Sequence, residues 1–138
     1  MKYIKIILSS LLVVFSSLSF AEVAVIVNAA NADALDKEEV GKIFLGKVKK
    51  FPSGNSIIPI NLSSGDAIRD GFDETVLEKS PKQVKSYWSK LVFTGKGTPP
   101  QEVGSAADML QLVSSNPDAI GYIPADQVND TVKVLFTY

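Results

Sequence analysis

The stretch Ile57-Ile58-Pro59-Ile60-Asn61-Leu62-Ser63-Ser64-Gly65-Asp66 decides the fold, because it joins an apolar segment to a Ser/Gly turn. The apolar residues predict a short strand over Ile57–Ile60, and the turn Ser63–Asp66 predicts the start of a helix. Apolar side chains then recur every four residues, which is typical of a helix with one buried face. A strand leading through a tight turn into a helix is a unit of α/β proteins.

The segments on both sides of this unit continue the same alternation. Three more apolar runs predict strands, at Val23–Val27, Ala119–Ile123 and Val132–Phe136. Three more helices are predicted from capping residues at their starts and from Gly or Asn-Pro at their ends: Asp36 to Gly46, Ser80-Pro81 to Gly95, and Gly104-Ser105 to Asn116-Pro117. This order predicts an α/β fold with a mostly parallel central sheet flanked by about four helices.

The N-terminus has the pattern of a cleavable secretory signal peptide. Lys2 and Lys5 precede the apolar run Ile6–Phe15, and Ser19-Phe20-Ala21 fits the rule for cleavage. A permanent anchor is the alternative, but the uncharged run is shorter than the ~20 residues of a membrane span. We therefore expect a signal peptide over 1–21, cleavage after Ala21, and a single domain over 22–138. The chain has no cysteine, so we do not expect a lipoprotein.

Composition narrows the classes of function. The formal net charge is −1, and it becomes −3 without Lys2 and Lys5, so a nucleic-acid partner is not expected. The chain contains no Cys and no His, which removes the usual side chains of nucleophilic catalysis, zinc binding and neutral-pH proton transfer. We therefore expect no enzyme, no cofactor and no metal. A hydrolase using Ser64 with Lys96 is a remote alternative, because the motif of a nucleophile elbow is absent.

The best candidate site is an anion-binding turn. A helix N-terminus presents free N–H groups and the positive end of the helix dipole, and serine hydroxyls add further donors. Ligands of open α/β sheets lie where strands end and helices begin. The candidate ligand-binding residues are Ser63, Ser64, Gly65 and Asp66, with Gly104 and Ser105 at the fourth predicted helix and Asn28 at the end of the first predicted strand. The same turn is also typical of an ordinary helix N-cap.

Asp66 opposes an anion at this turn. A like-charge pair about 4 Å apart costs about 4 kcal/mol at an effective dielectric constant near 20, whereas a helix dipole contributes only about 0.3–1 kcal/mol. A cation is therefore needed, and Arg69 and Lys96 are the candidate charge partners. Asp66, Asp70 and Asp73 share one face of the predicted helix. We interpret that face as solvated and not as a metal site.

Several motifs of the chain match a known family in order and spacing. They are Glu38–Lys47, Ile58–Asp66, Tyr87-Trp88 with Phe93-Thr94-Gly95, and Asn116–Tyr122. Through these motifs, which are spread over most of residues 22–138, the chain resembles the phosphate-type periplasmic substrate-binding proteins of ABC transporters. The resemblance implies a single lobe of the two-lobed type II periplasmic-binding-protein fold, located in the periplasm. Tyr87 and Trp88 also fit the buried stripe of a helix.

In that family a Ser-Gly-Thr turn at a helix N-terminus contacts phosphate, which assigns Ser64 and Gly65 to the ligand. Asp66 stands where the family has Thr, and Ile60 or Asn61 stands where it has an Arg. The resemblance implies a periplasmic solute-binding protein that binds phosphate or another small oxyanion, weakly or as a homodimer. The alternative is a periplasmic interaction or sensor-adaptor module that binds a membrane transporter or sensor component.

Overall fold

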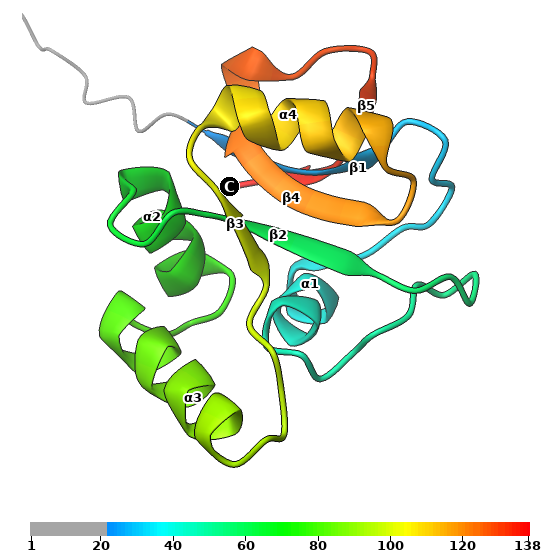
Figure 1. Ribbon diagram of the computed structural model, residues 1–138. Coiled ribbons are helices and arrows are strands. Elements are labelled where there is room, and N and C mark those ends of the chain that lie inside the picture. Colours follow the sequence, from blue (N-terminus) through cyan, green and yellow to red (C-terminus); the bar gives the residue numbers. More distant parts are fainter. Residues whose placement is uncertain (1–21) are drawn as a thin grey trace, which may run out of the picture.

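The computed structural model describes residues 22–138, and the predicted signal peptide over 1–21 lies outside the described residues. A five-stranded sheet forms the centre, in the order β3-β2-β4-β1-β5 (Figure 1). Its strands are β1 (Val23–Asn28), β2 (Ile58–Leu62), β3 (Gln101–Val103), β4 (Ala119–Pro124) and β5 (Val132–Thr137). Within residues 22–138, every helix is too short or too polar to span a membrane.

The direction of the strands confirms a mostly parallel sheet. β2 pairs in parallel with β3 and β4, whereas β1 pairs antiparallel with β4 and β5. Four strands therefore share one direction, and β1 alone runs the opposite way. The sequence analysis did not predict β3, because its three residues include only one apolar side chain and leave no periodic pattern.

The helices begin at the predicted caps. They are α1 (Lys37–Phe44), α2 (Ala67–Thr75), α3 (Pro81–Phe93) and α4 (Ala106–Ser115), and a short 3₁₀ helix, η1 (Ala125–Gln127), follows β4. Ser80 and Gln83 form a reciprocal capping box at α3, and the Asp36 and Ser105 side chains each accept from the backbone N–H three residues on. These caps satisfy N–H groups that a helix start otherwise leaves without a partner.

The sheet separates two helical layers. α4 covers one face of the sheet, and α1, α2 and α3 lie on the other side (Figure 1). Neighbouring residues of β4 show both faces, because successive side chains of a strand alternate. Gly121 lies against Met109 of α4, and Tyr122 contacts Phe44 of α1 and Phe72 of α2. Both faces are therefore buried, which is why β1 and β4 are almost continuously apolar.

The close approach of α4 to β4 requires a glycine at position 121. An added Cβ there would lie 2.3 Å from the sulfur of Met109, which is fully buried. We expect Gly121→Ala to lower the free energy of unfolding by about 1–3 kcal/mol, the usual cost of overpacking a core. Gly71→Ala in α2 is the matched control: open space surrounds that position, so it should raise stability by about 0.5–1 kcal/mol. Urea denaturation measures both, and equal effects would contradict this packing.

Candidate functional site

The turn after β2 has the conformation that its sequence predicts. The backbone N–H of Asp66 donates to the Ser63 carbonyl at 3.1 Å, and Gly65 between them has a φ of 90°. That left-handed conformation favours glycine, since a side chain would strain it. Ser64 and Gly65 are exposed. The turn therefore presents an open surface at the carboxyl end of β2.

Asp66 uses its own carboxylate to cap α2. Its Oδ1 accepts from the backbone N–H of Ile68 at 2.8 Å and from that of Arg69 at 3.4 Å. These are the donors that a bound anion would use at a helix N-terminus. The carboxylate of the chain itself therefore stands at the position of an external anion, and a ligand must use the remaining groups of the turn.

A second helix N-terminus lies at the same edge of the sheet. β3 pairs in parallel with β2, with Leu62 opposite Val103, so both strands end together. The Ser63 hydroxyl donates to the Val103 carbonyl at 3.2 Å and joins the two strand ends. Gly104 and Ser105 follow β3, and Ser105 caps α4. The structure thus brings the predicted residues of both turns to one edge.

Arg69 folds back from α2 to this edge, where carboxylates already engage it. Its Nη1 donates to the Leu62 carbonyl at 3.0 Å and to Glu102 Oε1 at 2.8 Å, and its Nε lies 3.6 Å from Asp73 Oδ1. The side chain is largely buried. The guanidinium therefore supplies a positive charge beside the turn, but two acidic side chains offset that charge.

Asp73 departs from the solvated acidic face that the sequence predicts. It lies in the last turns of α2 with 1% of its surface exposed, and Arg69 is its ion-pair partner. Burial raises the pKa of its carboxyl from 3.8 to about 6, although the nearby Arg69 lowers it in part. With Ser64, Trp88 and Glu102, the pair lines a cavity of about 210 Å³ between α2, α3 and β3.

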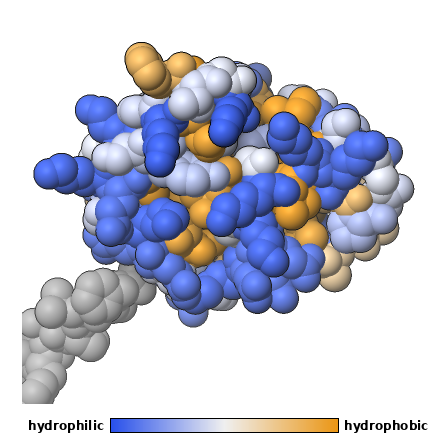
Figure 2. All heavy atoms as spheres, turned by 90° about the horizontal axis from the view of Figure 1, so that it is seen from below, coloured by the Kyte–Doolittle hydropathy of each residue, from blue (hydrophilic) through white to orange (hydrophobic). Residues whose placement is uncertain are grey.

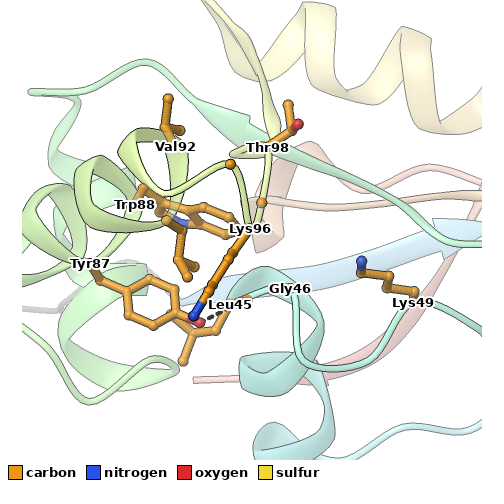
Figure 3. Close-up of a pocket in the computed structure, with 11 residues that line it drawn as sticks. Leu45, Gly46, Lys49, Tyr87, Trp88, Val92, Lys96 and Thr98 are labelled. Atoms are coloured by element: carbon orange, nitrogen blue, oxygen red, sulfur yellow. Dashed lines mark hydrogen bonds between the residues drawn. The ribbon is translucent and has the colours of Figure 1, made fainter.

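Two predicted residues lie away from the edge. Asn28 ends β1, which runs antiparallel, and its side chain donates to the carbonyls of Val113 and Ser114 at the C-terminal end of α4. It therefore lies at the opposite end of α4 from Ser105 and does not line the predicted cleft. Lys96 lines a different cavity, between the ends of α1 and α3 (Figure 3).

Sequence reasoning missed the buried polar pair behind the turn. The Tyr122 hydroxyl donates to Asn61 Oδ1 at 2.8 Å and accepts from the Leu62 N–H at 3.2 Å. Asn61 is almost fully buried although it is polar. A polar residue within the apolar strand was the available signal, because such a residue needs a partner when it is buried.

Solved structures of other proteins share this arrangement of strands and helices. A structure from Clostridium perfringens, described as a phosphate ABC transporter substrate-binding protein with bound phosphate, superposes with a TM-score of 0.65 at 23% identity. An ABC-type phosphate transport receptor from Vibrio cholerae gives 0.64 at 22%, and PstS from Borrelia burgdorferi gives 0.59 at 17%.

The chain has the fold of one lobe of a phosphate-type substrate-binding protein. The match covers 83–84% of this chain but only 45–47% of those proteins, so the chain spans about half of their length. Scans against family models and curated proteins find no match to the sequence. At these identities the likeness establishes the fold of the lobe, which includes the strand, turn and helix around Ser63–Asp66.

The raised pKa of Asp73 predicts an unusual pH dependence of stability. The folded protein retains this proton up to about pH 6, whereas the unfolded chain releases it near 3.8. The contribution of Asp73 is therefore greatest below pH 4 and is lost as the pH rises through 6. We expect the free energy of unfolding, relative to Asp73→Asn, to fall by roughly 2 kcal/mol between pH 4 and 7, because the unfolded chain is already partly protonated at pH 4.

Denaturant titrations at several pH values measure this difference. Asp130→Asn is the control, since Asp130 is an exposed loop carboxylate, and it should retain the pH dependence of the wild type. A constant difference between the wild type and Asp73→Asn from pH 4 to 7 would contradict the assignment.

Proposed function

We propose that this protein is an exported, periplasmic solute-binding protein and not an enzyme, and that it binds phosphate or another small oxyanion at the edge formed by β2 and β3. One observation carries the proposal: the N-termini of α2 and α4 meet at that edge, joined by the bond from Ser63 to Val103. Two helix dipoles and the exposed turns then face the same solvent. The bound phosphate in the superposable Clostridium perfringens structure supports the same class of ligand.

The charges around the turn imply weak binding. Arg69 attracts an anion, but Asp66, Asp73 and Glu102 stand close to it or to the turn. A single lobe also leaves the ligand partly in water, where charge pairs contribute about 1 kcal/mol or less. We infer a millimolar affinity for one chain, and a tighter site where a second copy or another protein closes over the edge.

A second candidate function follows from Asp66 itself. Its carboxylate already satisfies two N–H groups at the start of α2, so the helix is complete without a ligand. A lobe capped in this way is suited to serve as an interaction or sensor-adaptor module that contacts a transporter or sensor component of the membrane. Under this candidate, oxyanions do not bind at the turn.

Replacing Asp66 separates the two candidates. Asp66→Thr removes the negative charge and retains a capping hydroxyl, so the fold should persist and phosphate should bind several-fold more tightly, because about 1 kcal/mol of like-charge repulsion at this solvent-accessible turn is relieved. Asp36→Thr is the matched control, since Asp36 caps α1 in the same way but away from this edge, and its phosphate affinity should equal that of the wild type.

Isothermal calorimetry and thermal unfolding in phosphate at low salt measure these affinities. A ligand at 100 times its dissociation constant stabilises by about 2.7 kcal/mol, which a melting curve resolves. The absence of any phosphate effect on both the wild type and Asp66→Thr would overturn oxyanion binding and favour the interaction module.

A further inference from the structure

A groove lies between the C-terminal ends of α1 and α3. It does not include the turns after β2 and β3 that form the proposed oxyanion site. Its volume is about 730 Å³. Figure 3 shows that α3 supplies one wall and the end of α1 the other, while the loop after α3 closes one side. The lining includes the aromatic and apolar side chains of Leu45, Tyr87, Trp88, Leu91 and Val92.

The groove is held in shape by contacts that need no ligand. The Trp88 ring packs closely against two glycines. A Cβ added at Gly46 would lie 2.9 Å from the ring, and a Cβ added at Gly97 would lie 3.2 Å from it. The Tyr87 hydroxyl donates to the Leu45 carbonyl at 2.6 Å and ties α3 to the end of α1 (Figure 3). The apolar floor is therefore ordered before a partner binds, so binding loses little conformational entropy in these side chains.

The charged side chains of the groove have one sign. Lys49 and Lys96 line it on different sides (Figure 3), and none of the residues lining it is acidic. Within residues 22–138, neither lysine forms an ion pair. Two exposed ammonium groups beside an apolar floor favour an occupant that is both acidic and apolar.

The wall that α3 contributes to the groove leaves one large apolar side chain in solvent. Val92 lines the groove and is 53% exposed near the end of α3. Figure 2 views the molecule from the side of α3 and shows apolar side chains among hydrophilic ones on this face. The apolar surface thus extends from the floor at Trp88 to the solvent-exposed side chain of Val92.

We propose that this groove docks an acidic segment of a partner protein, with an apolar side chain over Trp88 and carboxylates at Lys49 and Lys96. Val92, which lines the groove and is half-exposed, packs against the same segment. A second copy of this chain fits less well, because a two-fold contact through this face would bring the lysines of both copies together. The proposal does not depend on oxyanion binding.

Trp88 is the only tryptophan of the chain and lines the groove, so its fluorescence should respond to an occupant there. The probe is the peptide acetyl-Asp-Glu-Phe-Leu-Asp-Glu-amide, added to the purified full chain at low salt. We expect a saturable change of Trp88 emission that weakens as salt rises. Two control peptides should bind at least tenfold more weakly. Asp-Glu-Ser-Ser-Asp-Glu lacks the apolar side chains, and Lys-Lys-Phe-Leu-Lys-Lys lacks the carboxylates.

Charge reversal on the protein gives the matched comparison. The double variant Lys49→Glu with Lys96→Glu should lose about tenfold or more in affinity, and Val92→Ser several-fold. Lys47→Glu with Lys50→Glu makes the same charge change on exposed lysines that do not line the groove, and it should bind as the wild type does. All three variants change exposed side chains, so their melting temperatures should stay near that of the wild type.

Three outcomes would overturn the proposal. One is no emission change with the acidic apolar peptide at millimolar concentration, and another is an equal loss in both lysine double variants. The third is a dimer in analytical ultracentrifugation that Val92→Ser dissociates, since a second copy would then occupy the groove. Peptide binding should be unchanged in Asp66→Thr and in excess phosphate, because both conditions alter only the proposed oxyanion site. This comparison distinguishes peptide binding in the groove from oxyanion binding at the edge.

Discussion

The hydroxyl of Tyr122 fixes the geometry on which the rest of the lobe depends. β2 and β4 share only two paired positions, and beyond them the hydroxyl joins the strands through Asn61 and the Leu62 N–H. The Tyr122 ring stacks on Phe72 of α2 at 3.9 Å. The Leu62 carbonyl accepts from Arg69, so side chains satisfy both backbone groups at the end of β2. The turn that starts at Ser63 is thereby positioned against β3, and with it the N-termini of α2 and α4.

The edge formed by β2 and β3 has the geometry of an anion site, but acidic side chains stand beside it. In the superposable proteins the chain continues to about twice this length, and one of them was solved with phosphate bound. Here the Asp66 carboxylate replaces an external anion at the start of α2, and Arg69 is shared with Asp73 and Glu102. The groove with Lys49 and Lys96 has the opposite balance, because among residues 22–138 these lysines form no ion pair and line the groove beside an apolar floor. Trp88 lines both cavities, so one core side chain shapes the two surfaces.

The sequence predicted what local patterns determine and missed what long-range contacts determine. Caps such as Ser80 and the helices after them were predictable, because capping and apolar periodicity act within a few residues. The meeting of the turns at Ser63 and Gly104 depends on the parallel pairing of β2 with β3, a strand whose three residues gave no pattern in the sequence. The antiparallel β1 could not be predicted from its own apolar residues, so Asn28 was assigned to the wrong edge. The burial of Asp73 depends on packing between α2 and α3, which helical spacing alone does not show.

Titration of the ¹⁵N-labelled protein with phosphate tests the central claim most directly, since each backbone amide reports separately. Weak, saturable shifts should be confined to residues 63–69 and 104–106, the segments that meet at the edge of β2 and β3. Residues near Asn28 should not respond, because they lie at the other end of α4. Shifts centred on Lys49 and Lys96, or shifts that rise linearly over scattered lysines, would contradict an anion site at this edge.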